Sequence, residues 1–215
     1  MKPTISRAAI ERMALYFRTL QIAREDGLQI ISSEEIGKRL NLTPVQVRKD
    51  LAVFGQFGMK GVGYYTGELS NKIGEILGLN NRWHLAIVGI GHLGGALANY
   101  KNFESMGFLL KALFDKDIRI IGSTVNDIKI SDIKNLKTVV SKRKIDIGVI
   151  TVPATEAQKV ANELIDAGVK GIWNFAPTKI ILPKEIPLVN EDLSMSLSTL
   201  AYRLSMIDDD DTIEE

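Results

Sequence analysis

The chain has 215 residues, enough for one large domain or two small ones, and its 45% hydrophobic and 25% charged residues are ordinary for a globular protein. Because the net charge is only +1, any contact with nucleic acid must come from a local basic patch. No apolar run approaches the ~18–20 residues that cross a bilayer. The lack of cysteine excludes disulfides, thiolate metal sites and thiol redox sensing. Together these features favour a cytoplasmic protein without membrane or metal partners.

Two hydrophobic patterns divide the chain near residue 80. Before it, helical periodicity alternates with short turns, and after it apolar strand-like runs alternate with helices. The Gly and Asn residues at 78–82 are typical of a joint between elements. We expect a first domain over 1–80, a second over 81–191, a C-terminal helix over 192–207 and a solvated acidic tail over 208–215.

The first two predicted helices span residues 6–26 and 32–41. In the first, apolar residues recur at helical spacing and Gly27 occupies a C-cap position. In the second, Ser32 is a candidate N-cap, and Glu35 three residues later forms a capping box with it.

A third helix is predicted from Thr43, as N-cap, to Gly55, with Pro44 at its first position. Its inner face consists of Val47, Leu51 and Phe54. Two helices joined by a turn of roughly three residues indicate a helix-turn-helix.

The outer face of that third helix carries Gln46, Arg48 and Lys49 near its N-terminal end, after Thr43. Early residues of the second helix of this motif reach base edges in the major groove. Arginine can bind guanine, glutamine can bind adenine and lysine suits a phosphate, so all four residues are candidate DNA contacts. The alternative is a solvated face of a structural helix.

Residues 57–65 are predicted to form a short hairpin with a glycine turn. A hairpin directly after the second helix of a helix-turn-helix is a wing. Lys60 and Tyr64 are expected along phosphate or the minor groove, and Gly61 and Gly63 of the turn are candidate DNA contacts as well. A fourth helix over 68–77 completes a winged-helix order.

A glycine-rich motif follows the apolar strand predicted over 84–88 and precedes a helix of small residues. Its residues are Gly89, Ile90, Gly91, His92, Leu93 and Gly94. In this context the pattern is typical of dinucleotide binding. Gly89 permits the tight turn, Gly91 lets the backbone approach the pyrophosphate, and Gly94 lets the helix pack closely on the strand. Close packing for stability alone is the alternative.

A second strand over 109–114 ends at Asp115, which lies 21 residues beyond Gly94. An acid at this place holds the adenosine ribose hydroxyls, and its charge favours NAD over NADP. Lys116, a further candidate cofactor contact, and Arg119 lie close in sequence and weaken that preference.

Two further strands, over 146–151 and 170–174, flank a helix over 155–167. Ligands bind at the carboxyl ends of such strands, where the sequence has Thr151, Val152 and Pro153 and then Asn174, Phe175, Ala176 and Pro177. Pro153 or Phe175 is a candidate to flank a nicotinamide, and a purely structural turn is the alternative for each.

The sequence lacks a suitable acid–base group for a dehydrogenase. His84 begins a strand and His92 lies inside the phosphate loop, so neither is placed to act on a substrate. No segment is left for a substrate domain, because 1–80 is assigned to the winged helix. The second domain is therefore predicted to bind its ligand without catalysis.

A narrow apolar seam marks the C-terminal helix. It consists of Leu193, Leu197, Leu200, Leu204 and Ile207, spaced four and three residues apart. This spacing favours docking on a partner subunit, with or without swapping, over packing on the chain's own sheet.

The whole chain resembles the Rex family of redox-sensing transcriptional repressors. The resemblance rests on residues 46–51, 61–64, 88–94, 114–115, 151–153 and 171–177. It implies an α/β protein with an N-terminal winged helix-turn-helix, a Rossmann domain (a doubly wound parallel sheet) and a C-terminal dimerisation helix. It also implies a homodimer that binds palindromic operator DNA when NADH is low and releases it when NADH binds, with NAD+ competing.

The resemblance further implies that Arg18, Tyr100 and Asp192 form a polar switch between domains or subunits. His92 stands where the family often has another residue.

Two alternatives remain: an NAD-dependent oxidoreductase with a helical extension, and a coenzyme A-binding domain of the ligase type. The missing acid–base residues argue against the first and Asp115 against the second.

Overall fold

The computed structural model describes residues 6–59 and 61–210, with the backbone alone for Arg7 and 207–210. The chain divides into two compact units, Met1–Asn81 and Arg82–Glu215, which are described separately. Lys60 and residues 211–215, which fall in the expected wing and acidic tail, lie outside the described residues.

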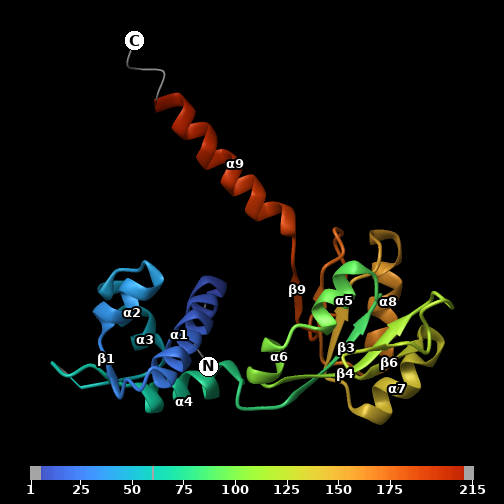
Figure 1. Ribbon diagram of the computed structural model, residues 1–215, viewed down its shortest axis with the longest axis horizontal. Coiled ribbons are helices and arrows are strands. Elements are labelled where there is room, and N and C mark those ends of the chain that lie inside the picture. Colours follow the sequence, from blue (N-terminus) through green and yellow to red (C-terminus); the bar gives the residue numbers. More distant parts are fainter. Residues whose placement is uncertain (1–5, 60, 211–215) are drawn as a thin grey trace. The chain divides into compact units, whose positions relative to one another are not determined.

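The first unit contains three helices, a wing segment and a fourth helix, in the expected order (Figure 1). Its elements are α1 (Arg7–Glu25), β1 (Ile30–Ile31), α2 (Ser33–Leu40), α3 (Pro44–Phe54), β2 (Tyr64–Tyr65) and α4 (Thr66–Leu77). The expected caps are present, because Ser32 Oγ accepts from the Glu35 amide at 3.0 Å and Thr43 Oγ1 accepts from the Gln46 amide at 3.1 Å. The helix-turn-helix is therefore confirmed, and α4 begins two residues earlier than expected.

The wing differs from the expected hairpin. Met59 and Gly63 form one isolated antiparallel bridge, and β2 pairs instead with β1, matching Ile31 with Tyr64. The pairing is close, because a Cβ on Gly63 would lie 2.7 Å from the Ile31 carbonyl oxygen. A strand of two residues is too short to show a period of two, so β1 has no sequence signature.

One apolar core holds the first unit together. The buried side chains come from all four helices and both strands, and they include Met13, Tyr16, Leu20, Ile36, Val47, Leu51, Tyr64, Leu69 and Ile73. Val47 and Leu51 confirm the inner face expected for the third helix.

The second unit is a doubly wound α/β domain. Its elements are β3 (Trp83–Val88), α5 (His92–Ala98), α6 (Asn102–Ser105), β4 (Phe108–Asp115), β5 (Thr124–Val125), β6 (Ile128–Asp132), a 3-10 turn (Ile133–Asn135), α7 (Leu136–Arg143), β7 (Ile147–Ile150), α8 (Ala154–Asp166), β8 (Gly171–Asn174), β9 (Leu188–Asn190) and α9 (Leu193–Asp210). The sheet order is β5-β6-β4-β3-β7-β8-β9, and all pairs are parallel except β5 with β6. Without β5 this is the 3-2-1-4-5-6 order of dinucleotide-binding sheets.

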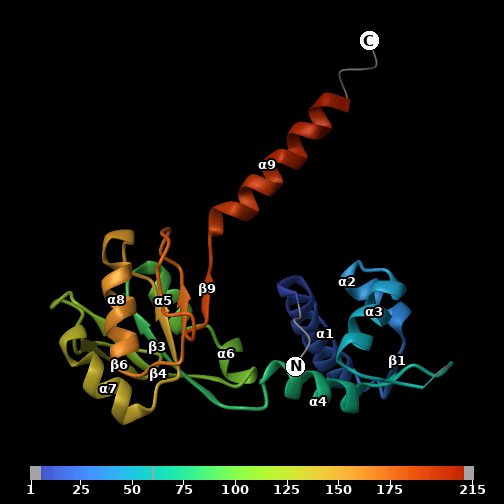
Figure 2. The same ribbon diagram turned by 180° about the vertical axis from the view of Figure 1, so that it is seen from behind.

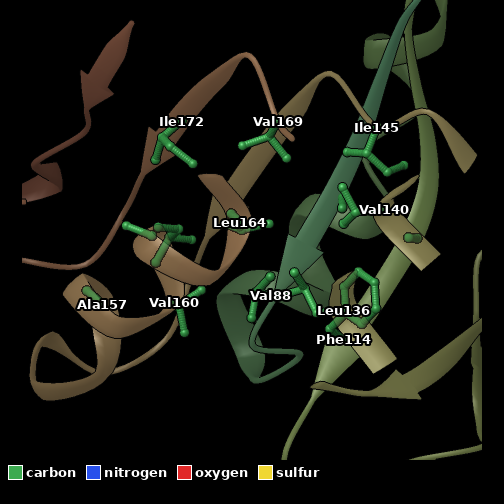
Figure 3. Close-up of a cluster of buried hydrophobic side chains, with 14 of the residues drawn as sticks. Val88, Phe114, Leu136, Val140, Ile145, Ala157, Val160, Leu164, Val169 and Ile172 are labelled. Carbon is green, nitrogen blue, oxygen red and sulfur yellow. The ribbon is translucent and has the colours of Figure 1, made fainter. Parts of the chain in front are cut away.

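Helices cover both faces of this sheet (Figures 1 and 2). Val88 and Phe114 face α7 and α8, where they pack with Val140, Val160 and Leu164 (Figure 3). The alternate residues Leu85 and Ile87 pack on the opposite face, which includes Ala98 of α5. The continuous apolar runs of β3 and β4 follow from this burial on both sides.

The apolar residues of α9 are exposed. Leu193, Leu197, Leu200 and Leu204 have relative exposures of 65%, 67%, 52% and 54%, while Ile207, the fifth seam residue, lies outside the described side chains. The alternative in which this helix packs on its own sheet is therefore wrong. Within the described ranges, none of the helices combines the length and apolar character needed to cross a membrane.

Candidate functional site

A cleft of about 610 Å³ opens at the carboxyl ends of β3, β4, β7 and β8. Most residues predicted to bind a cofactor line it: Gly89, Ile90, Gly91, Leu93, Asp115, Lys116, Thr151, Val152, Pro153, Phe175 and Pro177. Four parts of the chain that are distant in sequence thus meet at the place where open α/β sheets bind ligands.

Two glycines of the motif are required by the backbone geometry. Gly89 has a φ of +97°, and a Cβ there would lie 2.8 Å from Val152 Cγ1. A Cβ on Gly94 would lie 1.9 Å from the carbonyl oxygen of Gly89, so α5 approaches the turn more closely than any other residue allows. A Cβ on Gly91 would meet nothing within 4 Å, and this residue borders the open cleft.

Asp115 ties the end of β4 to the glycine turn. Its Oδ2 accepts from the Ile90 amide at 2.6 Å, and its Oδ1 accepts from the Asp117 amide at 2.9 Å. A carboxylate has about four acceptor positions, so both oxygens can still accept from the hydroxyl groups of a ligand. On the opposite wall, Thr151 Oγ1 donates to the carbonyl oxygens of Val88 and Gly89, at 3.0 and 2.7 Å.

The other predicted cofactor residues shape the site without lining it. His92 is exposed in the first turn of α5, and Gly94 lies behind the turn. Asn174 is fully buried; its Oδ1 accepts from the Ala176 amide at 3.0 Å, and its Nδ2 donates to Asn190 Oδ1 at 3.0 Å. Asn174 therefore fixes the turn that presents Phe175 to the cleft.

A row of aromatic rings leads from Phe175 to the surface. Ring centroids are 4.6 Å apart for Phe175 and Trp173, 5.8 Å for Trp173 and Phe103, and 4.9 Å for Phe103 and Tyr100. Tyr100 is half exposed, and its hydroxyl accepts from Asn102 Nδ2 at 3.2 Å.

The three residues proposed as a switch belong to different segments of the chain. Arg18 is exposed on α1 of the first unit. Asp192 precedes α9, and its Oδ1 accepts from the hydroxyl and the amide of Ser194, at 2.5 and 2.9 Å, which lowers the pKa of Asp192. None of the described hydrogen bonds joins Tyr100 to Asp192.

Part of the outer face of α3 already contacts other residues of the first unit. Lys49 is exposed and has no hydrogen-bond or ion-pair partner among the described residues. Arg48 donates from Nη1 to Ser33 Oγ at 2.7 Å and to Glu34 Oε1 at 3.3 Å. Lys49 is thus the cation of this face that is available without breaking an existing contact.

Two of the predicted DNA contacts interact with other residues of the first unit. Tyr64 packs into the core of the first unit, and Tyr65, the next residue of β2, is the exposed tyrosine at 45%. Gln46 is partly exposed and donates from Nε2 to Asp50 Oδ1 at 2.7 Å. Among the other wing residues, Gly61 and Gly63 have positive φ values of 80° and 109°.

Sequence reasoning missed the buried carboxylate that Gln46 contacts. Asp50 is 4% exposed and also accepts hydrogen bonds from Arg12 and from the hydroxyl of Tyr16, at 2.5 to 2.8 Å. Burial alone would raise the pKa of Asp50, but the hydrogen bonds from these three side chains outweigh it and hold the pKa below its ordinary value. No local pattern could reveal a pair of residues 38 positions apart.

Comparisons with known proteins agree with both units. The family described as "CoA binding domain" matches residues 80–178, and "Putative DNA-binding protein N-terminus" matches residues 4–52. A "Redox-sensing transcriptional repressor Rex" of Clostridium perfringens (strain SM101 / Type A) is 46% identical over 204 residues, which covers 95% of this chain and 96% of that protein. Another, from Syntrophobacter fumaroxidans (strain DSM 10017 / MPOB), is 46% identical over 202 residues, covering 94% and 96%.

Solved structures resemble the whole chain as well. RSP in complex with β-NAD+ and operator DNA matches with a TM-score of 0.90 at 38% identity, covering 99% of this chain and 98% of that one. RSP in complex with β-NADH matches with a TM-score of 0.87 at 37% identity, covering 99% and 100%.

A winged helix joined in one chain to a doubly wound domain with a ligand cleft defines a ligand-responsive transcription regulator. The chain belongs to the Rex family of redox-sensing transcriptional repressors. This confirms the family predicted from the residues and the winged-helix and Rossmann fold. The relatives that match over 96% of their own length are named repressors, so the oxidoreductase and ligase alternatives are set aside.

Proposed function

We propose that this protein is a cytoplasmic homodimeric repressor that binds palindromic operator DNA and is released when NADH occupies its cleft. The cleft carries the proposal, because it combines a glycine turn, an acid at the end of β4 and an apolar wall at the ends of β7 and β8. The RSP complexes, one with operator DNA and β-NAD+ and one with β-NADH, support both ligands.

Different residues of the cleft would contact different parts of the cofactor. The backbone from Gly89 to Leu93 would hold the pyrophosphate, since amides at the start of a helix attract anions. Asp115 would accept from the ribose hydroxyls. Pro153 and Phe175 would flank the nicotinamide, and an apolar wall disfavours the positive ring of NAD+, because burial of an unpaired charge is costly. NAD+ should therefore compete weakly with NADH.

The DNA surface would be formed by α3 and the wing. Lys49 would contact phosphate and Arg48 a base, with Lys60 of the wing along the backbone. A palindromic operator requires two such surfaces about 34–36 Å apart. The exposed apolar face of α9 supports a second copy of the chain as the partner that brings them together.

Release by NADH requires that NADH and DNA prefer different arrangements of the dimer. Linkage then makes DNA weaken NADH binding by the same factor by which NADH weakens DNA binding. Arg18, Tyr100 and Asp192 are proposed to carry part of this coupling.

Operator binding measured by fluorescence anisotropy, with NADH, NAD+ or neither, tests the proposal. We expect binding without cofactor and with NAD+, and loss of binding with NADH. Equal operator affinity under all three conditions would overturn the sensing function, and a lack of operator binding under every condition would overturn the repressor assignment.

A further inference from the structure

The charges around the cleft are strongly unbalanced. Three carboxylates line it, from Asp115, Asp117 and Glu156, against one cation, Lys116. Such a cleft repels additional negative charge. The sequence alone left this balance open, because Lys116 follows Asp115 directly, Arg119 comes four residues after Asp115, and either cation is suited to bind a phosphate.

Both of these cations are already held by carboxylates. Lys116 Nζ lies 3.5 Å from Glu156 Oε1, so the first turn of α8 reaches the residue that follows β4. The guanidinium of Arg119 binds the Asp117 carboxylate through Nε at 2.9 and 3.0 Å and through Nη2 at 2.6 Å. The same contact lowers the pKa of Asp117 to about 2, so this carboxylate remains charged at neutral pH.

Neither ion pair, Lys116 with Glu156 or Arg119 with Asp117, is explained by a contribution to the stability of the fold. The side chains of Lys116 and Arg119 are 68% and 84% exposed, and ion pairs in such positions add little to folding. Glu156 also interacts favourably with the N-terminus of α8, but any acid in that turn would do so. Glu156 is placed so that it also reaches Lys116 at the rim of the cleft.

We propose that Glu156 and Asp117 are specificity residues that make the cleft select NADH over NADPH, by holding Lys116, which lines the cleft, and Arg119, which lies four residues after Asp115, so that neither cation is free to bind a 2′-phosphate. The proposal rests on the NADH site proposed above. Asp115 repels the 2′-phosphate directly, whereas Glu156 and Asp117 remove the groups that could compensate for that repulsion. A 2′-phosphate carries about −1.5 to −2 charges at neutral pH, so it would meet three carboxylates and no free cation.

The test is a pair of titrations, with NADH and with NADPH, on the unmodified full-length protein, Glu156→Gln, Asp117→Asn and the double variant. Glu163→Gln is the matched control, because it makes the same change on α8 at a residue that does not line the cleft. Cofactor fluorescence gives the affinities, and circular dichroism verifies that each variant is folded.

We expect Glu156→Gln and the double variant to raise NADPH affinity about tenfold, the effect of one charge-assisted hydrogen bond to phosphate, and to leave NADH affinity within about twofold. The gain should diminish at high salt because exposed charges are screened. Unchanged NADPH affinity in every variant, or an equal gain in Glu163→Gln, would overturn the inference while NADH binding remains. Failure of the unmodified protein to bind NADH would instead overturn the proposed function.

Discussion

The guanidinium of Arg12 on α1 donates two hydrogen bonds to the carboxylate of Asp50 on α3, from Nε to Oδ2 at 2.5 Å and from Nη2 to Oδ1 at 2.8 Å. Tyr16 donates to the same carboxylate from one turn further along α1, at 2.7 Å. Bidentate pairs of this kind fix geometry as well as supplying energy. The helix proposed to enter the major groove is therefore held in a defined orientation by α1.

We predict that Asp50→Ala destabilises the first unit by about 2–3 kcal/mol. This is slightly below the ~3–5 kcal/mol for breaking fully buried pairs, because the Arg12 side chain is 27% exposed. Hydrogen exchange of α1 and α3 amides measures the local opening free energy. Lys49→Ala, on the exposed side of α3, is the control and should change it by less than about 0.5 kcal/mol. Equal protection in both variants would contradict the role of Asp50.

The lowered pKa of Asp50 predicts a pH dependence of stability. Since the folded value lies below the ordinary ~3.9, the carboxylate stabilises the fold at all pH values above ~3.9. That contribution is lost as the pH falls through the folded value. The difference in unfolding free energy between the unmodified chain and Asp50→Asn should thus be largest near neutral pH and shrink in acid. Urea titrations between pH 3 and 7 test this, and a difference that grows in acid would show the opposite sign.

Lys49 and Arg48 are predicted to affect DNA binding in different ways. Lys49→Ala should weaken binding to all sequences and reduce the slope of log affinity against log salt by about 1. Arg48→Ala should cost about 1–3 kcal/mol and relax the sequence preference. Anisotropy titrations on operator and scrambled DNA at several salt concentrations separate the two. If both variants keep full operator affinity, α3 is not the recognition helix.

Neighbouring glycines in α5 offer a matched pair. Gly94→Ala should destabilise the second unit by about 1–3 kcal/mol and remove NADH binding, because its Cβ would lie 1.9 Å from the Gly89 carbonyl oxygen. A Cβ on Gly95 meets nothing within 4 Å, so Gly95→Ala should be neutral or up to ~1 kcal/mol more stable. Thermal unfolding and NADH titration measure both effects. Similar behaviour of the two variants would refute the tight packing at Gly94.

The exposed seam of α9 predicts the oligomeric state. Leu200→Asp should convert dimers to monomers or weaken them strongly, because it places a charge in the apolar face proposed to meet a second copy. Ser198→Asp adds the same charge outside the seam and should leave the dimer intact. Sedimentation velocity distinguishes the species, and a dimer unaffected by Leu200→Asp would place the interface elsewhere.

Features that depend on neighbouring residues in the chain were predictable. The caps at Ser32 and Thr43 and the glycine turn before α5 each need only a few consecutive residues, and all appear where the sequence places them. The acid at the end of β4 was found by its distance from that turn, because in dinucleotide-binding domains the acid follows the glycine motif by about 20 residues.

Features that depend on distant residues were not predictable. The partner of β2 is the two-residue strand β1, the partner of Asp50 is Arg12, and Glu156 meets Lys116 only when α8 is packed on the sheet that contains β4. Tyr64 was expected along DNA because it lies in the predicted wing, and its burial accompanies a pairing with β1 that the wing pattern does not reveal.

The aromatic row beside the cleft gives the protein an optical signal of its own. The indole of Trp173 packs at a tilt against Phe175, which lines the cleft. The indole Nε1 donates to Glu191 Oε1 at 3.2 Å, and Glu191 is followed by Asp192, which precedes α9. The emission of Trp173 therefore depends on contacts with both the cleft wall and the segment before the last helix. Tryptophan fluorescence can thus follow occupancy of the cleft and rearrangement of that segment without a label, independently of the light emitted by the cofactor.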